Sequence, residues 1–403
     1  MKVMQINTVC GTGSVGRIMV DLIETLRAEG DCGIAAFGRR EAPPGIAAYK
    51  FGTNLDMGIH VLHTFLHGEH GFASKKRTLR LIKKIEEYNP DIIHLHNIHG
   101  FYLNVELLFS YLKKAGKPVV WTLHDCWSFT GHCAYFDYSG CNKWKTGCEA
   151  CPQHKKVYPY ALFKDNSRQN YSRKKAAFTN VPELTLVTPS SWLSSLVKES
   201  YLKEYPIRVI PNGISLDKFH PIDKGLKRRL GMEKKFILLG VAGMWEERKG
   251  YAYFEALADR LDDSFQIILI GLSRKKLRKL HPGIYGVMRT ESMEELAEYY
   301  SMADVYVNPT LEDNFPTTNL EALACGTPVV TFATGGSVES VDENTGKIVT
   351  KGNIEGLLKA IEELRGEPSK EAACLKKAEE YNKKDRFREY LNLYRELLEE
   401  RDA

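Results

Sequence analysis

A chain of 403 residues is too long for one ordinary domain and suits two domains of about 200 residues each. Its 43% hydrophobic and 27% charged residues are values of a globular protein. The net charge of +5 is uneven, because residues 1–208 carry 27 Lys and Arg against 18 Asp and Glu. This basic half lacks the aromatic interleaving of a nucleic-acid-binding surface, and it fits an anionic membrane or a pyrophosphate-linked lipid better.

The sequence has no run of about 18 apolar residues, so we expect no transmembrane helix. The apolar stretch at Met1–Asn7 is too short for a signal peptide and has no small-residue cleavage site. We therefore expect the protein in the cytoplasm or at the cytoplasmic face of a membrane.

Strand and helix patterns alternate along the chain in two successive series. In the first series, short β-rich runs predict strands at Val3–Val9, Gly33–Phe37, Ile92–His96, Val119–Leu123, Leu184–Thr188 and Arg208–Pro211. Helical periodicity predicts helices between them at Gly16–Ala28, Thr78–Tyr88, Val105–Ala115 and Trp192–Tyr201. The second series predicts strands at Phe236–Val241, Gln266–Ile270, Val305–Asn308, Val329–Phe332 and Lys347–Thr350, and helices at Gly250–Leu261, Met293–Met302, Thr317–Ala324 and Ile354–Leu364. Such alternation predicts an α/β fold of two doubly wound domains, with ligands in a cleft beyond the carboxyl ends of the strands.

A turn-rich string, Ile210-Pro-Asn-Gly213, marks the boundary between the two series. We expect an N-terminal domain of residues 1–212 and a C-terminal domain of residues 213–382. The segment 383–403 has apolar residues at helical spacing and is predicted to be a helix.

A glycine-rich turn follows the first predicted strand, with the spacing G-x-G-x-x-G at Gly11, Gly13 and Gly16, and Arg17 comes next. Glycines at this spacing let the backbone approach a pyrophosphate. A dinucleotide site also needs an acidic residue at the end of the second strand, where this chain has Arg39. The turn is therefore a poor NAD site, and a simple tight strand–helix turn would need only one or two of the glycines.

A basic segment at Lys75–Ile85 is predicted as a helix with Leu79, Ile82 and Ile85 inward. Such a run is either a solvated face or a surface that lies on anionic lipid.

His124 follows the buried run Val119–Leu123, at the strand end where active-site residues gather in such sheets. The next residue, Asp125, is placed to orient its imidazole. His94 and His96 are expected in the core or lining the cleft, and we assign them no role.

Four of the nine cysteines fall within 19 residues: Cys133, Cys141, Cys148 and Cys151. In a cytoplasmic protein, thiolates at such spacing favour a structural zinc ion over disulfides, with His132 as a substitute ligand. A reduced thiol cluster and disulfide bonds are the alternatives.

Arg248 and Lys249 lie at the start of a predicted helix, after the strand Phe236–Val241. Cations there oppose the helix dipole, at a cost of about 0.3–1 kcal/mol each, unless an anion is bound. A bound diphosphate removes this conflict, and a solvated basic pair is the alternative.

The segment from Asp313 to Glu321 holds two carboxylates eight positions apart, around a turn that opens a short helix. The free N–H groups and the positive dipole end of that helix suit a phosphate or a hydroxyl-rich ligand.

This segment resembles the E-x7-E element of the retaining glycosyltransferases of family 4, with Asp313 in place of the first Glu. Other motifs resemble that family in the same order, namely the H-D element at His124, the K-G at Lys249 and the G-G-x-P-E element at Gly335 and Gly336. The insertion at 132–151 is similar to Cys-rich insertions in a branch of the family from bacterial exopolysaccharide clusters, of the colanic-acid type.

The resemblance implies the GT-B fold, in which two Rossmann-like domains face each other across a cleft and the C-terminal helix crosses back to the first domain. It implies transfer of a sugar from a nucleoside diphosphate sugar to a hydroxyl of a glycan or lipid-linked acceptor, with retention and without a catalytic metal. The pathway implied is cell-surface polysaccharide synthesis.

The resemblance also implies roles for five residues. Glu321 would hold the ribose, Arg248 and Lys249 the diphosphate, and Asp313 and His124 the sugar. The further residues implied beside the donor are Gly11, Gly13, Gly16, Arg17, Gly243, Asn314, Phe315, Pro316, Thr317, Gly335 and Gly336.

The chain departs from the family where the usual phosphate-binding Arg would fall on Met244, and Arg248 or Arg17 could supply that charge instead. Three other functions remain open. They are a GT-B sugar-nucleotide epimerase, a non-catalytic protein that binds sugar nucleotides, and a zinc-dependent nucleic-acid-binding protein.

Overall fold

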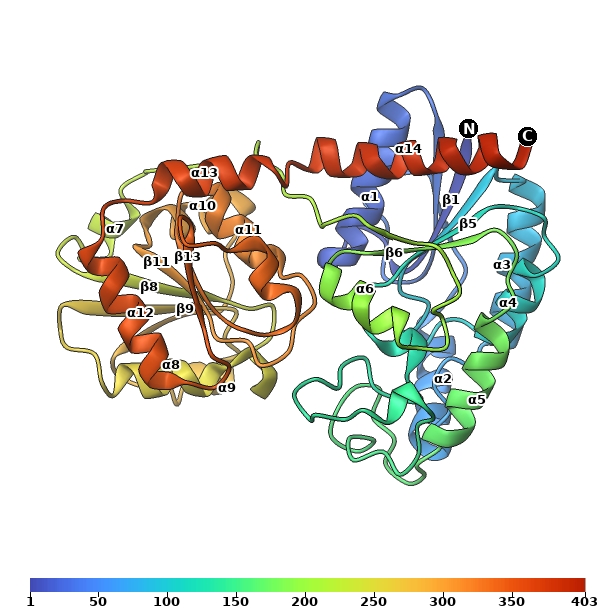
Figure 1. The fold of residues 1–403 in the computed structure, drawn as a ribbon, viewed down its shortest axis with the longest axis horizontal. Coiled ribbons are helices and arrows are strands. Elements are labelled where there is room, and N and C mark those ends of the chain that lie inside the picture. The colour runs from blue at the N-terminus through green and yellow to red at the C-terminus, as the bar shows by residue number, and fades with distance from the viewer. Residues whose placement is uncertain (403) are drawn as a thin grey trace. The chain divides into compact units, whose positions relative to one another are not determined.

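The computed structural model describes residues 1–402, and the chain forms two compact units (Figure 1). Unit 1 contains Met1–Pro211 together with the segment from Phe387 onward, and unit 2 contains Asn212–Arg386. Each unit has its own sheet and its own apolar core.

Unit 1 is built on a seven-stranded parallel sheet in the order β3-β2-β1-β4-β5-β6-β7. Its strands are β1 (Lys2–Val9), β2 (Cys32–Arg39), β3 (Ala48–Lys50), β4 (Ile92–Leu95), β5 (Val119–Thr122), β6 (Leu184–Thr188) and β7 (Ile207–Val209). Its helices before the last one are α1 (Gly13–Ala28), α2 (Asn54–His67), α3 (Lys75–Tyr88), α4 (Val105–Leu112), α5 (Ser167–Phe178) and α6 (Ser191–Lys198). The central strands β4, β5 and β6 are buried along their whole length, as expected for a parallel sheet covered on both faces.

Unit 2 is built on a six-stranded parallel sheet in the order β10-β9-β8-β11-β12-β13. Its strands are β8 (Phe236–Val241), β9 (Phe265–Ile270), β10 (Ile284–Val287), β11 (Val305–Asn308), β12 (Val329–Phe332) and β13 (Gly346–Val349). Its helices and 3₁₀ turns include α7 (Leu226–Arg229), η3 (Glu247–Lys249), α8 (Tyr251–Ala258), α9 (Arg274–Leu277), α10 (Met293–Met302), α11 (Thr317–Ala324), η4 (Gly335–Ser340), α12 (Ile354–Gly366) and α13 (Glu371–Glu379). The two parallel sheets confirm the predicted α/β fold of two doubly wound domains.

The last helix, α14 (Lys383–Asp402), belongs to unit 1 from Phe387 onward (Figure 1). Its buried side chains pack with those of α1 and of the central strands. Two tyrosines also reach polar groups of the sheet. Tyr394 Oη lies 2.6 Å from His94 Nδ1, and Thr122 Oγ1 donates to Tyr390 Oη at 3.3 Å. His94 is therefore a core residue that joins the helix to the sheet.

Helix α3 does not have the predicted inner face. Its buried residues are Thr78, Leu81 and Ile85, whereas Leu79 is 55% exposed. The prediction that Leu79 points inward was wrong, because Thr78, Leu81 and Ile85 follow the 3.6-residue period and leave Leu79 on the opposite side. Among residues 1–402, no helix is both long and apolar enough to cross a bilayer.

Candidate active site

Two carboxylates of unit 2 lie in and just after the loop that follows β11. Asp313 and Glu321 are 9% and 8% exposed, so both are removed from bulk water. Glu321 lies in α11, where its Oε2 accepts a hydrogen bond of 2.9 Å from the Tyr300 hydroxyl. The N-cap of α11 is Pro316, and no side chain caps the first turn of this helix.

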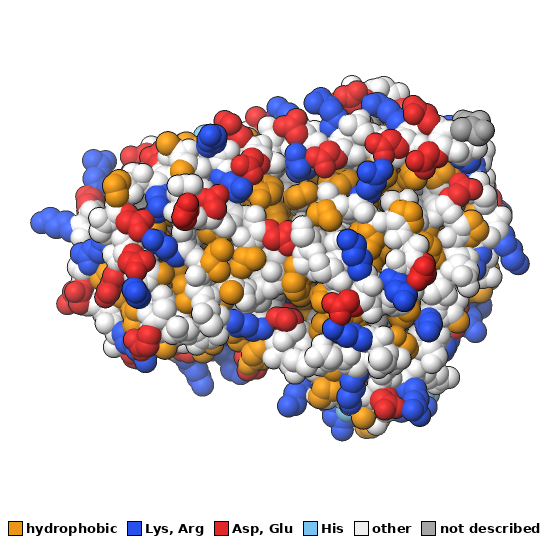
Figure 2. All heavy atoms as spheres, in the orientation of Figure 1, with side chains coloured by type: hydrophobic (Ala, Val, Ile, Leu, Met, Phe, Trp, Pro, Cys, Tyr) orange, Lys and Arg blue, Asp and Glu red, His pale blue; other side chains and the backbone are white. Residues whose placement is uncertain are grey.

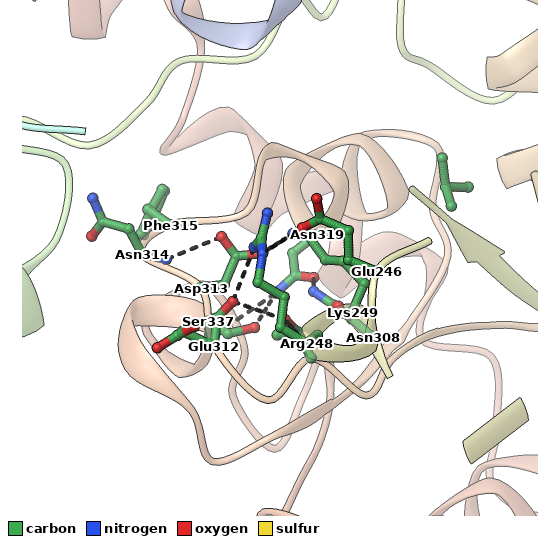
Figure 3. A network of polar contacts seen from close by, with 12 residues as sticks. Glu246, Arg248, Lys249, Asn308, Glu312, Asp313, Asn314, Phe315, Asn319 and Ser337 are labelled. Atoms are coloured by element: carbon green, nitrogen blue, oxygen red, sulfur yellow. Dashed lines mark hydrogen bonds and ion pairs between the residues drawn. The ribbon is translucent and has the colours of Figure 1, made fainter. Parts of the chain in front are cut away.

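Arg248 and Lys249 lie in the 3₁₀ turn η3, one residue before α8, rather than within the first turn of that helix. Lys249 Nζ lies 2.5 Å from Asp313 Oδ2, and Arg248 Nε lies 2.9 Å from Glu246 Oε2. The turn after β8 thus brings both cations to the Asp313 loop after the neighbouring strand β11 (Figure 3).

The backbone of η3 is clamped to the loop after β11. The carbonyl of Arg248 accepts hydrogen bonds from the Leu311 N–H at 2.7 Å and from the Thr310 hydroxyl at 3.2 Å. Gly250, which follows η3, has a φ of +74°, and a Cβ there would lie 2.1 Å from the carbonyl oxygen of Pro309. A glycine is therefore needed at position 250 for the two loops to approach this closely.

A buried amide joins the carboxylate helix to the glycine turn of η4. Asn319 of α11 accepts a hydrogen bond from Asn308 Nδ2 at 2.8 Å and donates to the Ser337 carbonyl at 3.1 Å (Figure 3). η4 begins with Gly335 and Gly336, of which Gly335 has a φ of +54°. The sequence analysis did not select Asn319 as a site residue, although its position two residues before Glu321 could have indicated one.

Gly243 and Met244 follow β8 and are exposed. A Cβ at Gly243 would meet no atom within 4 Å, so the fold leaves space beside it. Met244 is 69% exposed, so no packing constraint explains a methionine where the resemblance implies a cation.

In unit 1, His124 lies just past the end of β5, and its Nε2 is 3.2 Å from His96 Nδ1. Burial lowers the pKa of His124 to about 4, so its imidazole is neutral at pH 7. Asp125, which we expected to orient the His124 imidazole, hydrogen-bonds to a different histidine. Its Oδ2 lies 2.8 Å from His99 Nε2, because His99 follows the neighbouring strand β4 and faces the carboxylate directly.

The contact between Asp125 and His99 begins a chain of polar groups that the sequence analysis missed. His99 Nδ1 lies 3.0 Å from Tyr158 Oη, which in turn lies 3.2 Å from His70 Nε2. Burial raises the pKa of Asp125, but His99, the Trp127 N–H and His124 together outweigh that effect and hold the pKa below its ordinary value. The available signal was that His99, like His124, follows a buried strand.

The glycine turn after β1 is explained partly by packing. Gly11 and Gly13 have φ values of +70° and +68°, and a Cβ on Gly11 would lie 2.3 Å from a side-chain atom of Pro43. Gly16 lies against Val9, where a Cβ would find atoms at 3.2 Å. Gly13 has no atom within 4 Å of its Cβ position, so it alone of the three faces open space. The next residue, Arg17, is exposed, and its Nε donates to the Gly13 carbonyl at 3.3 Å.

Cys133, Cys141, Cys148 and Cys151 line one cavity of unit 1. A hydrogen bond with Cys133 lowers the pKa of the Cys151 thiol to about 7, and the same bond raises that of Cys133. Cys148 Sγ instead accepts a hydrogen bond from the Gly131 N–H at 3.1 Å.

Across residues 1–402, no group of three or more His, Cys, Asp or Glu is arranged to hold a metal ion. The predicted zinc site is therefore not supported, because the thiols bond to one another and to the backbone instead of converging on one point. All nine cysteines are free thiols, so the structure also contains none of the alternative disulfides among its described residues.

Two family models match the chain. One is described as Glycosyltransferase Family 4 and matches residues 15–218, and the other is described as Glycosyl transferases group 1 and matches residues 235–366. Together they cover most of unit 1 and the sheet of unit 2.

Curated relatives match over part of their length. The putative colanic acid biosynthesis glycosyl transferase WcaC of Escherichia coli (strain K12) is 26% identical over 66% of this chain and 65% of its own length. D-inositol 3-phosphate glycosyltransferase of Geodermatophilus obscurus is 33% identical over 36% of each chain. The chain thus covers less than two thirds of the length of these relatives.

Solved structures share the fold over nearly the whole chain. Sucrose-phosphate synthase from Thermosynechococcus elongatus superposes with a TM-score of 0.74 at 18% identity, covering 98% of both chains. HepE of Anabaena, solved in complex with UDP, superposes with a TM-score of 0.66 at 15% identity, covering 98% of this chain and 99% of its own. At these identities the likeness establishes the GT-B fold alone.

Proposed function

Since this chain belongs to glycosyltransferase family 4, we propose that it transfers a sugar from a nucleoside diphosphate sugar to a hydroxyl of a glycan or lipid-linked acceptor. The name of the Escherichia coli relative supports a place in cell-surface polysaccharide synthesis. The UDP bound to HepE supports a nucleotide donor. A third relative, from Campylobacter jejuni, is named as a transferase to a diphospho-undecaprenol acceptor and is 32% identical over 35% of this chain. It supports a lipid-linked acceptor.

One observation carries this proposal. Lys249 is held by η3 on the carboxylate of Asp313, Arg248 donates to the Glu312 carbonyl next to it, and the N-terminus of α11 that follows has no side-chain cap. In this proposal the two cations bind the donor diphosphate and neutralise the charge that develops on it as the sugar departs. Lys249 then exchanges part of its pairing with Asp313 for the phosphate, which frees that carboxylate for the sugar.

We propose the remaining roles from the family motifs. Glu321 holds the ribose hydroxyls, with Tyr300 fixing one of its oxygens. The backbone from Asn314 to Thr317 positions the sugar, together with the glycines of η4. Neutral His124 contacts a sugar hydroxyl, and the Gly11–Arg17 turn lies on the acceptor side. We propose retention at the anomeric carbon by a same-face route, with Arg248 and Lys249 supplying the charge that a catalytic metal would otherwise bring.

The test is a panel of UDP, GDP, ADP, TDP and CMP in thermal-shift experiments on the wild type and on Glu321→Gln. A nucleotide at a hundredfold excess over its dissociation constant stabilises the folded state by about 2.7 kcal/mol, so one base is expected to raise the wild-type midpoint clearly. Glu321→Gln keeps an acceptor for the Tyr300 hydroxyl and removes the charge, so it should fold and lose most of that shift.

Glu343→Gln is the matched control, because Glu343 is exposed in unit 2. It should keep the full shift. The proposal fails if no nucleotide moves the wild-type midpoint, or if both Glu variants respond like the wild type. If the protein converts a nucleotide sugar to its epimer without an acceptor, its function is that of an epimerase rather than a transferase.

A further inference from the structure

Helix α2 has its polar face inward and its apolar face outward. Its buried residues are His60 and Thr64, each 1% exposed. The exposed residues Leu55, Ile59, Leu62 and Leu66, at 74%, 59%, 58% and 44%, follow one another at steps of four, three and four, which places them on one side of the helix. An ordinary surface helix has the opposite arrangement.

The contacts on its inner side fix α2 in this orientation. His60 Nδ1 lies 2.8 Å from Ser74 Oγ, and the Thr64 hydroxyl donates to the Glu69 carbonyl at 3.2 Å. Thr53 and Asp56 form a capping box at the start of the helix. A rotation of α2 that buried the leucines would break these bonds. The bonds therefore keep the apolar side of the helix facing outward.

A loop beside the end of α2 adds to the apolar side. The Leu162 N–H donates to the Phe65 carbonyl at 3.2 Å, which places residues 160–163 against the last turn of the helix. Leu162 and Phe163 are themselves exposed, at 48% and 74%. We call Leu55, Ile59, Leu62, Leu66, Leu162 and Phe163 the outer apolar face.

The surroundings of the outer apolar face are cationic. Lys155, Lys156 and Lys164 are exposed in the segment 152–164, which contains no Asp or Glu. The single acidic residue of α2, Asp56, is paired with Arg77 at 2.6 Å. Figure 2 shows apolar, basic and acidic side chains next to one another at the end of unit 1 where Figure 1 places α2.

An apolar strip with a basic rim has the chemistry of a surface that enters the interfacial layer of an anionic bilayer. A second copy of the chain is a worse occupant, because a two-fold interface would set the same lysines against each other. A neutral apolar protein groove would leave the lysines without a counter-charge.

We propose that the outer apolar face inserts into the headgroup layer of an anionic membrane, with Lys155, Lys156 and Lys164 on lipid phosphates. The need for a membrane rests on the proposed function, since a lipid-linked acceptor lies at a bilayer surface. The contact is made by α2 and the 160–163 loop, whereas α3, which the sequence analysis singled out, supplies cations beside it.

The test is co-sedimentation of the full chain with vesicles of phosphatidylcholine alone, or with about 30% phosphatidylglycerol, at about 0.1 M salt. The wild type should sediment with the anionic vesicles. Ile59→Glu combined with Leu62→Glu should reduce the bound fraction about tenfold or more, because charges replace inserted apolar groups. Met288→Glu combined with Ile348→Glu, at exposed apolar positions of unit 2, is the matched control and should bind as the wild type does.

The thermal shift with the active nucleotide is measured on every variant, which separates this proposal from the proposed function. An α2 variant that keeps the nucleotide thermal shift but loses vesicle binding supports membrane insertion of the outer apolar face. The proposal is overturned if the wild type binds neither kind of vesicle, or if the unit 2 control loses as much vesicle binding as the α2 variant does. Light scattering on both proteins tests self-association. If the wild type is a dimer, the α2 variant is a monomer and neither binds vesicles, the outer apolar face is a dimer interface and the membrane proposal is overturned.

Discussion

At the scale of single residues, the candidate site is organised by buried polar side chains as much as by charges. Asn319 connects β11, α11 and η4 through its amide, and it is fully buried. A buried amide with both ends bonded rigidifies the elements it joins, whereas the same amide with one end unpaired is costly. The position of Glu321, one half-turn further along α11, depends on this amide.

Replacing Asn319 with alanine should therefore destabilise the fold, although alanine favours a helix more than asparagine does. Asn319→Ala leaves the Asn308 amide without its acceptor and removes one of two side-chain donors to the Ser337 carbonyl, and we expect a loss of about 2 kcal/mol in the free energy of unfolding. Urea unfolding measures it, with Asn344→Ala, at an exposed position of the same unit, as the control. Equal midpoints for the two variants would show that the network does not stabilise the fold.

The histidines show how far the sequence could identify site residues. A histidine just past a buried strand points to a site, and that rule selected His124. The same rule applies to His99, which was missed because no motif surrounds it. The partner of Asp125 could not be inferred from adjacency, since in a parallel sheet the nearest group comes from the neighbouring strand, here β4.

At the scale of elements, strands and helices with strong periodicity were predicted, and elements with a weak or reversed pattern were not. The eleven predicted strands all occur among the thirteen strands of the two sheets, and β3 and β10 were not predicted. The three-residue β3 and the four-residue helices α7 and α9 are too short for a period to show. Helix α2 escaped prediction because its buried side carries His60 and Thr64, whereas its leucines are outside.

The close approach of η3 to the loop after β11 makes a sharper prediction. Gly250→Ala adds a Cβ 2.1 Å from the Pro309 carbonyl oxygen in a left-handed residue. Gly231 has a similar φ of +67° but no atom within 4 Å of its Cβ position. Gly231→Ala should cost about 1 kcal/mol from backbone strain alone.

Gly250→Ala should cost more than that control, because the two loops must also separate. It should weaken the nucleotide thermal shift as well, since η3 carries Arg248 and Lys249. Calorimetric midpoints of both variants, with and without the nucleotide, measure the two effects. Equal midpoints and equal shifts would mean that the loops yield without affecting the site.

At the scale of the whole molecule, the two units differ in their titratable cores. Ten of the twelve histidines belong to unit 1. Burial lowers the pKa of His60 and His94 to about 3, and that of His124 and His132 to about 4. These imidazoles are neutral in the folded unit and take up protons when it unfolds below their ordinary pKa of 6.5.

The sign of the pH effect follows from proton linkage. Because the folded pKa values lie below the unfolded one, the stabilisation is fully present above pH 6.5 and is lost as the pH falls from 6.5 towards 3 or 4. Each histidine contributes a slope of up to about 1.4 kcal/mol per pH unit in that window. Unit 1 should therefore unfold before unit 2 as the pH is lowered, and its calorimetric transition should move to lower temperature between pH 7 and pH 5.

Two variants at the junction of α14 with the sheet separate proton linkage from packing. His94→Gln removes one titrating group, so the free energy of unfolding of unit 1 should fall less steeply with decreasing pH than in the wild type. Tyr394→Phe removes the hydroxyl bonded to His94 Nδ1 and keeps the imidazole, so stability should fall at every pH while the slope stays. Urea unfolding at pH 7, 6 and 5 measures both. If His94→Gln keeps the wild-type slope, the buried imidazole is not a source of the acid sensitivity.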